Sequence, residues 1–247
     1  MADRWFDGTF YKREVTMNHM NCNAENKVFL HYILGMFSEI AGDECESKGQ
    51  DREFFINYGM IFLITRMSIR FHKTPKYSET IILTTWYRAA EGKFFFREFE
   101  VRYPDGELVA SATCTWALVD PVGQRALDAS EYPGSTSCGI NKKTDSPECK
   151  KIITDSLLQI LGFRPIYYTD LDCNHHVNNS VYSKIATDFL PEAYQNREVS
   201  DYVINFNKET KLGETLEIRG GESPLGYIVQ GYCNGYQHFA CEFTFRS

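Results

Sequence analysis

The same order of elements occurs twice along this chain, and that repetition limits the fold more than any single motif. Each half begins with apolar residues at three- and four-residue steps, which is the spacing of a helix with one buried face. Each then continues with segments in which apolar and polar residues alternate, as in half-buried strands. The helical segments are residues 23–42 and 181–189, with Asn23 as the expected N-cap and Gly42 as the expected end of the first. We therefore expect two copies of one unit, each a helix followed by an antiparallel sheet.

Four strands are expected after each helix. They are residues 63–71, 80–87, 94–103 and 107–119 in the first half, and 201–208, 214–219, 226–233 and 237–246 in the second. The dipeptides Asp105-Gly106 and Asn234-Gly235 fall at the same place in the two halves, and both are typical of tight hairpin turns. Two more short matches keep the same order: Met-Asn-Cys-Asn at 20–23 with Leu-Asp-Cys-Asn at 171–174, and Glu79-Thr80 with Glu214-Thr215.

A segment rich in Pro, Gly, Ser, Thr and Lys separates the two halves. We expect an N-terminal domain over residues 1–125, a linker over 126–160 and a C-terminal domain over 161–247. A long helix followed by a curved antiparallel sheet fits a hotdog unit, in which the sheet wraps the helix and two units pair. The expected fold class is α+β, as a tandem double hotdog.

Charge and hydropathy exclude several functions. The 26 basic and 33 acidic residues give a net charge of −7, which argues against nucleic acid or an anionic membrane as the main partner. No apolar run approaches the roughly 20 residues that span a bilayer, and the sequence does not open with a charged and then apolar signal. We expect a cytoplasmic protein.

The densest set of reactive side chains lies at residues 169–182, just before and into the second helix. Asp172, Asn174 and His176 alternate along a segment that we expect to be extended, which would offer a carboxylate, an amide and an imidazole to a substrate carbonyl and a water. The N-H groups at the helix start would stabilise negative charge on that carbonyl. The alternative is structural: Asp172 or Asn174 caps the helix, and the neighbouring asparagines make local turn bonds.

Other histidines carry less information. The adjacent pair His175-His176 has metal-ligand chemistry, but neighbouring side chains of an extended segment point in opposite directions, and no matching Cys/His pair follows. We therefore expect no metal site. His19, His31, His72 and His238 are isolated in the sequence, and we expect each of them to be structural or to lie at the surface.

Residues 170–182 resemble the motif D-x-D-x-N-x-H-V-N-N-x-x-Y of acyl-carrier-protein thioesterases. The likeness runs over roughly residues 10 to 246, and Thr85-Trp86 and the segments 94–101, 110–116 and 118–120 resemble the first hotdog unit of that family. The chain looks like a bacterial-type member. The resemblance implies hydrolysis of a fatty acyl thioester of acyl carrier protein (ACP) to free fatty acid and holo-ACP, which ends chain elongation. It also implies that the first unit houses the acyl chain, that the second is catalytic, and that no metal or organic cofactor is needed.

The resemblance assigns catalytic roles to Asp172, Asn174, His176 and Glu209. Our hypothesis is that Glu209 or Asp172 deprotonates a water while Asn174 and His176 fix that base and the thioester. Plant members commonly have a cysteine directly after the glutamate. This chain has Thr210 there, which argues against an obligatory cysteine nucleophile at that position.

The expected partner is ACP, an acidic protein that would need a basic area for docking. Candidates are Lys142, Lys143, Lys150, Lys151 and Arg164, although these residues equally fit an ordinary solvated linker. The alternative functions are an acyl-CoA thioesterase, a hotdog dehydratase and a non-catalytic acyl-binding module. A monomer would suffice to pair two hotdog units, and a homodimer is also permitted.

Overall fold

The computed structural model describes residues 3–123, 125–134, 139–153 and 157–246. The chain divides into two compact units, unit 1 with residues 1–28 and 36–149 and unit 2 with residues 29–35 and 150–247. Each unit contains an antiparallel sheet. The predicted order, a helix followed by antiparallel strands in each half, is confirmed.

The sheet of unit 1 has the order β1-β2-β4-β5-β6-β3, and β7 pairs with β6. Its four predicted strands are confirmed to within a few residues, while the hairpin of β1 and β2 was not predicted. The strands are β1 (Arg4–Asp7), β2 (Phe10–Thr16), β3 (Ile61–Phe71), β4 (Thr80–Glu91), β5 (Phe94–Arg102), β6 (Leu108–Asp120) and β7 (Arg125–Ala126). The short helices are η1 (His19–Asn21), α2 (Arg52–Asn57) and η2 (Ala129–Glu131).

The long helix α1 spans Leu30–Ser47, so both of its predicted ends are wrong. Asn23 is not the N-cap, because its side chain accepts the backbone N-H groups of Glu25 (3.1 Å) and Lys27 (2.9 Å) and closes a turn ahead of the helix. Gly42 does not end the helix, since its backbone stays helical. The apolar spacing located the helix but not its boundaries.

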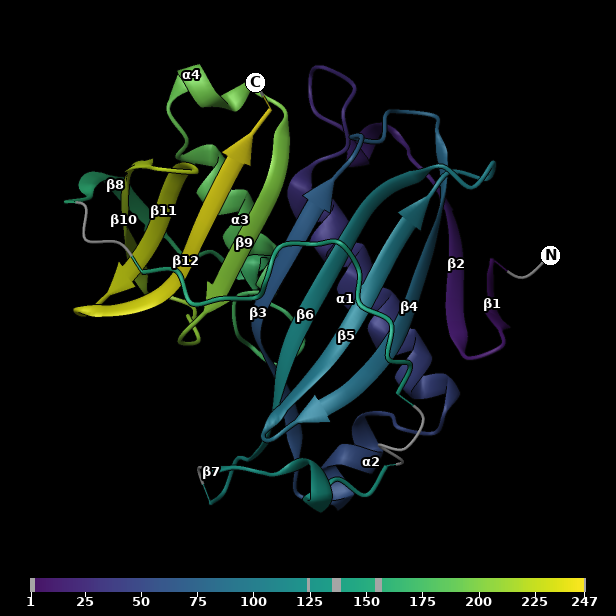
Figure 1. The fold of residues 1–247 in the computed structure, drawn as a ribbon. Coiled ribbons are helices and arrows are strands. Elements are labelled where there is room, and N and C mark those ends of the chain that lie inside the picture. Colours follow the sequence, from purple (N-terminus) through teal and green to yellow (C-terminus); the bar gives the residue numbers. More distant parts are fainter. Residues whose placement is uncertain (1–2, 124, 135–138, 154–156, 247) are drawn as a thin grey trace. The chain divides into compact units, whose positions relative to one another are not determined.

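Residues 36–47 of α1 belong to unit 1 and lie along its sheet (Figure 1). Phe37 of α1 stacks on Phe99 of β5, with ring centroids 4.6 Å apart. The buried apolar side chains of α1 recur at the predicted three- and four-residue steps: Ile33, Leu34, Met36, Phe37, Ile40 and Ala41. This apolar face is what holds the helix in place.

The sheet of unit 2 has the order β9-β12-β11-β10-β8. Its elements are β8 (Gln159–Pro165), η3 (Tyr168–Asp170), α3 (Asn179–Asp188), α4 (Glu192–Gln195), β9 (Val199–Phe206), β10 (Thr215–Ser223), β11 (Gly226–Cys233) and β12 (Tyr236–Phe245). The predicted hairpin at Asn234-Gly235 is confirmed: both residues have positive φ (51° and 79°), which the primed two-residue turns require. Strand β8 was not predicted.

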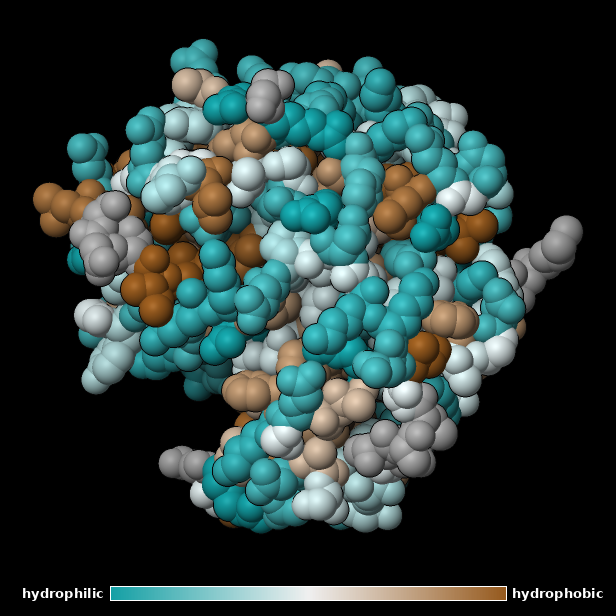
Figure 2. All heavy atoms as spheres, in the orientation of Figure 1, coloured by the Kyte–Doolittle hydropathy of each residue, from teal (hydrophilic) through white to brown (hydrophobic). Residues whose placement is uncertain are grey.

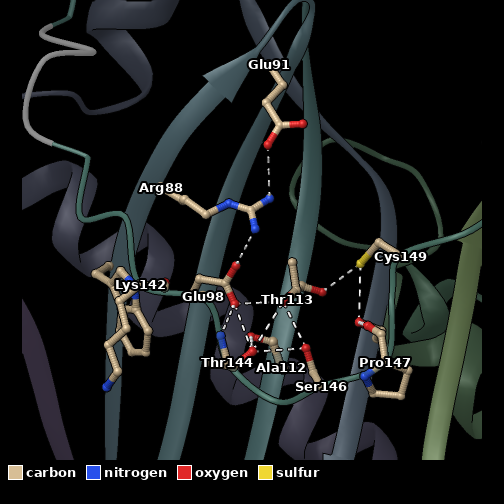
Figure 3. A network of polar contacts seen from close by, with 12 residues as sticks. Arg88, Glu91, Glu98, Ala112, Thr113, Lys142, Thr144, Ser146, Pro147 and Cys149 are labelled. Atoms are coloured by element: carbon tan, nitrogen blue, oxygen red, sulfur yellow. Dashed lines mark hydrogen bonds and ion pairs between the residues drawn. The ribbon is translucent and has the colours of Figure 1, made fainter.

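Residues 139–149, which fall within the predicted linker, lie across the sheet of unit 1 (Figure 3). The Trp86 indole N-H donates to the Lys142 carbonyl at 2.9 Å. The fully buried carboxylate of Glu98 accepts hydrogen bonds from Thr113 Oγ1 (2.7 Å) and from the backbone N-H (3.2 Å) and hydroxyl (2.8 Å) of Thr144. The crossing segment therefore supplies hydrogen bonds to one buried carboxylate oxygen of this sheet face, Glu98 Oε2.

Strand β8 forms one edge of the sheet in unit 2 and carries the exposed apolar side chains Ile160 and Phe163. Figure 2 shows brown side chains over the part of unit 2 that contains β8, β10 and β11. In the part of the chain that the structure describes, no helix is both long enough and apolar enough to span a bilayer.

His31 is expected to make the stability of the protein depend on pH. Its ring stacks on Phe29 (4.9 Å between centroids), and burial together with the positive charge of Lys184 lowers its pKa from 6.5 to about 4. Between these two values the unfolded chain binds a proton that the folded chain does not, so stability is lost as the pH falls from about 6.5 towards about 4. Because the ring is partly exposed, we expect the loss to be about 1–2 kcal/mol rather than the full value of the shift.

Urea unfolding at about pH 7.5 and about pH 5 checks this dependence. The variant His31→Phe keeps an aromatic ring and should lose less stability between the two pH values than the unmodified chain. An equal loss in both proteins would show that His31 is not responsible.

Candidate active site

The predicted site segment forms a tight turn between η3 and α3. Leu171 and Val177 pair as an isolated β-bridge, and the Asp172 N-H donates to the His176 carbonyl at 2.8 Å. At the tip, His175 has a φ of +63°, a left-handed conformation that reverses the chain. The expectation of an extended segment with alternating side chains is therefore wrong.

The Asp172 carboxylate lies against the backbone of this turn. Its Oδ1 accepts the N-H groups of Asn174 (2.8 Å) and His176 (3.3 Å). The N-cap of α3 is Asn178, whose side chain accepts the Ser180 N-H at 2.9 Å, so neither Asp172 nor Asn174 caps the helix. Asp172 fixes the shape of the turn, while the side chain of Asn174 is exposed.

Glu209 comes from a separate segment and meets His176. Glu209 Oε2 lies 3.0 Å from His176 Nε2, and the two side chains are 49% and 30% exposed. The backbone joins the two segments, because the Val177 N-H donates to the Thr210 carbonyl (2.9 Å) and His176 pairs with Lys211 as a bridge. The structure thus brings together a partly exposed imidazole and carboxylate that are far apart in the sequence.

Two N-H groups at the start of α3 are already used within the protein. The Ser180 N-H donates to the Asn178 side chain, and the Val181 N-H donates to the Asn178 carbonyl, both at 2.9 Å. We had expected such groups to bind the oxyanion of a substrate. That role is not supported for the N-H groups of Ser180 and Val181.

Thr210, directly after Glu209, is fully buried. Its hydroxyl contacts the Tyr182 hydroxyl at 3.0 Å and His238 Nδ1 at 2.7 Å. The expected structural role of His238 thus includes a contact next to the site, which sequence reasoning missed. No local pattern could have indicated it, because 28 residues separate Tyr182 from Thr210 and another 28 separate Thr210 from His238.

Two of the proposed docking cations are held within their own units. Arg164 pairs with the buried Asp170 at 2.9 Å, and Lys142 pairs with Glu100 at 2.7 Å. Lys150 and Lys151 are exposed. Among the residues described, no group of three or more His, Cys, Asp or Glu side chains is placed to hold a metal ion.

Unit 1 contains a cavity of about 320 Å³. It combines aromatic and aliphatic walls with a few charged groups, the usual composition of a site for a small apolar ligand. Its lining includes Phe62, Trp86, Phe95, Tyr132, Ile140 and the charged residues Glu44 and Lys48.

Two family models match the chain. Residues 8–131 match the acyl-ACP thioesterase N-terminal domain, and residues 159–239 match the acyl-ACP thioesterase C-terminal domain. An acyl-[acyl-carrier-protein] hydrolase of Cuphea viscosissima is 21% identical over 94% of this chain, and an oleoyl-acyl carrier protein thioesterase of Arabidopsis thaliana is 21% identical over 85%. The chain spans 59% and 62% of the length of these two relatives.

Solved structures agree on the fold. An acyl-ACP thioesterase from Bacteroides thetaiotaomicron superposes with a TM-score of 0.87 at 19% identity, covering 96% of this chain and 98% of that one. A 12:0-ACP thioesterase from Umbellularia californica superposes with a TM-score of 0.82 at 15% identity, covering 98% and 99%. The predicted double hotdog is thereby confirmed. With both of its domains matched in order, the chain belongs to the acyl-ACP thioesterase family.

Proposed function

We propose that this chain hydrolyses fatty acyl-ACP thioesters to free fatty acid and holo-ACP. The observation that carries the proposal is the contact of 3.0 Å between His176 Nε2 and Glu209 Oε2, at a partly exposed position on the motif that resembles the family's catalytic segment. A carboxylate paired with an imidazole beside open solvent is suited to remove a proton from water.

In the proposed reaction, Glu209 accepts a proton from a water that His176 helps to orient. The water oxygen attacks the thioester carbonyl carbon while the Asn174 amide donates to the carbonyl oxygen. The C-S bond then breaks, and the departing sulfur takes up the proton that Glu209 accepted, which gives the thiol of holo-ACP and restores the carboxylate. Asp172 supports this site by holding the turn with the backbone N-H groups of Asn174 and His176, which favours Glu209 over Asp172 as the base.

We assign the acyl chain to the N-terminal domain, residues 1–125, and catalysis to the C-terminal domain, residues 161–247, with residues 126–160 connecting them. The cavity in unit 1 supports the first assignment, because its lining is mostly apolar. The positions of His176 and Glu209 support the second.

Comparing the two carriers tests the proposal. With the same acyl chain on ACP and on CoA, we expect a higher kcat/KM for the ACP thioester. If Lys151 contributes to docking of the acidic carrier, Lys151→Glu should lower kcat/KM for acyl-ACP by about threefold to tenfold and leave acyl-CoA unaffected. Lys93→Glu, at an exposed position in the turn between β4 and β5, controls for the change in net charge.

Each other outcome indicates a different function. A higher kcat/KM with CoA indicates an acyl-CoA thioesterase. Tight binding of acyl thioester without release of thiol indicates a binding module, and conversion of a β-hydroxyacyl thioester without thiol release indicates a dehydratase.

A further inference from the structure

Three buried side chains behind the candidate site form a cluster, the Tyr182–Thr210–His238 cluster. The exposed fractions of these residues are 3%, 0% and 1%. Tyr182 Oη donates to Thr210 Oγ1 at 3.0 Å and accepts the Thr210 N-H at 3.1 Å. Thr210 Oγ1 lies 2.7 Å from His238 Nδ1, and because it already accepts the Tyr182 proton, its own proton is available for the ring. Burial lowers the pKa of His238, which favours the neutral ring that accepts such a bond.

The cluster holds the segment that carries Glu209. The N-H groups of Asn207 and Lys208 both donate to the His238 carbonyl, at 2.8 and 3.1 Å, and the His238 ring interacts with the Glu209 backbone. On the other side of Glu209, the Thr210 carbonyl accepts a hydrogen bond from the N-H of Val177, the residue after His176. Glu209 is therefore fixed by bonds on both sides, although its segment has no regular secondary structure.

The first half of the chain repeats the turn of the candidate site. Cys22 and Val28 form the same isolated bridge as Leu171 and Val177. The left-handed residue at the tip is Asn26 (φ 60°) in the first half and His175 (φ 63°) in the second. These matches align Asn23 with Asp172 and Lys27 with His176.

The first half also repeats the supporting loop. The Val28 N-H donates to the Pro75 carbonyl at 2.9 Å, as the Val177 N-H does to Thr210. The N-H groups of His72 and Lys73 donate to the Val109 carbonyl, as those of Asn207 and Lys208 do to His238. The aligned pairs are Thr74 with Glu209, Pro75 with Thr210, Val109 with His238 and, as fourth residues of α1 and α3, Ile33 with Tyr182.

Comparing the two halves shows that the backbone hydrogen bonds of this region do not require the polar cluster. Ile33, Pro75 and Val109 are buried and apolar, and the same backbone bonds form with them. The polar cluster occurs in the half where Asp172, His176 and Glu209 occur. Burying three polar side chains costs free energy that apolar residues would not, so the fold alone does not explain the cluster. A fully bonded buried network does, however, fix the position of the groups attached to it.

We propose that His238, acting through Thr210 and Tyr182, is a positioning residue that holds the Glu209 carboxylate against His176. This inference rests on the proposed function, because it assigns to Glu209 the role of base. A base displaced by about 1 Å can lose about 10²-fold in rate. We therefore expect His238→Val, which introduces the residue of the first half, and Thr210→Val to lower kcat by about tenfold to about 10²-fold.

Steady-state kinetics with an acyl-ACP thioester, together with thermal unfolding, test the proposal. In His238→Val and Thr210→Val the loss should fall on kcat, with KM within about twofold of the unmodified value and a displaced acid limb in the pH profile of kcat. Thr210→Ser keeps the hydroxyl and should retain most of the activity. Tyr182→Phe keeps the ring packing on Phe239 and should lose activity as Thr210→Val does.

Tyr202→Phe is the matched control. Tyr202 is fully buried in unit 2, and its hydroxyl bonds Ser183 Oγ (2.8 Å) and Cys241 Sγ (3.0 Å), neither of which belongs to the Tyr182–Thr210–His238 cluster. We expect it to lower stability and leave kcat unchanged.

The outcomes distinguish this inference from the proposed function. If the unmodified protein releases no thiol, the proposed function fails; if Glu209→Gln is fully active, the role of Glu209 fails. If Glu209→Gln is impaired while His238→Val, Thr210→Val and Tyr182→Phe all keep kcat, the positioning role alone is overturned. It is also overturned if Thr210→Ser loses as much activity as Thr210→Val, or if Tyr202→Phe loses as much kcat as the cluster variants.

Discussion

Replacing Glu209 by glutamine is expected to lower kcat for thioester hydrolysis by about 10²- to 10⁴-fold, the usual contribution of a general base. This corresponds to about 2.7–5.5 kcal/mol of activation free energy. A carboxamide keeps the size of the side chain and can still contact His176 Nε2, now 3.0 Å from Oε2, but it cannot take a proton from water. Because Glu209 is about half exposed, the substitution should leave the fold intact.

Two further variants sharpen this prediction. Glu217→Gln removes a carboxylate from β10 that pairs with Arg219 at 2.5 Å, and it should keep full activity. The double variant Glu209→Gln/His176→Ala should be little slower than the slower single variant, since groups that act as a unit are not additive. A folded Glu209→Gln protein with unchanged kcat would refute the assignment of the base.

Replacing Arg97 by methionine is expected to destabilise unit 1 by about 3–5 kcal/mol, because it leaves a buried charge without its partner. Arg97 and Glu44 form an ion pair in which the side chains are 3% and 0% exposed. The Arg97 guanidinium also lies over the Tyr87 ring, 3.8 Å from its centroid, and Lys48 bonds Glu44 at 2.5 Å. Lys48 is partly exposed, so it can compensate only part of the Glu44 charge.

Urea unfolding measures this effect through the midpoint and the m-value. The double variant Arg97→Met/Glu44→Leu removes both charges and should be more stable than Arg97→Met alone, because apolar replacement of a whole buried pair is often nearly neutral. A loss below about 1 kcal/mol in Arg97→Met, or a double variant less stable than the single one, would contradict this account of the pair.

The fold was predictable where the sequence pattern is local. Alternation located eight strands, and the Asn234-Gly235 turn was predicted from residues that tolerate positive φ. Asp105-Gly106 lies in the longer connection between β5 and β6, where Gly106 has a φ of 94°. Strands β1, β2 and β8 were missed, since these short segments, at or next to an edge of their sheet, have no clear alternating pattern. Helix α1 was predicted to begin at Asn23 because asparagine caps helices, but here it closes the preceding turn instead.

The repeat was recognised with an error of alignment. The matched cysteines suggested that Cys22 corresponds to Cys173, whereas the bridges align Cys22 with Leu171. The side chains at equivalent positions of the two halves differ, whereas the backbone hydrogen bonds are the same. Matching residue identities therefore gave the wrong alignment of the halves. Only the backbone revealed that Val109 and His238 occupy the same place in the two halves.

The candidate site was predicted partly by chemistry and partly by resemblance. The density of polar residues at 169–182 indicated Asp172, Asn174 and His176 as candidates. No local pattern connects this segment to Glu209, which was assigned from the family resemblance. The contact of Glu209 with His176 depends on pairing between segments distant in the sequence. The same holds for the Tyr182–Thr210–His238 cluster, which no periodicity marks.

The most direct test of the central claim is to incubate the purified protein with ACP thioesters of eight to eighteen carbons and to follow free thiol and free fatty acid together. Glu209→Gln and His176→Ala serve as controls. The account predicts equal release of thiol and fatty acid by the unmodified protein, with a preferred chain length, and a large loss in both variants. No release at any chain length, or release at an unchanged rate in both folded variants, would contradict it.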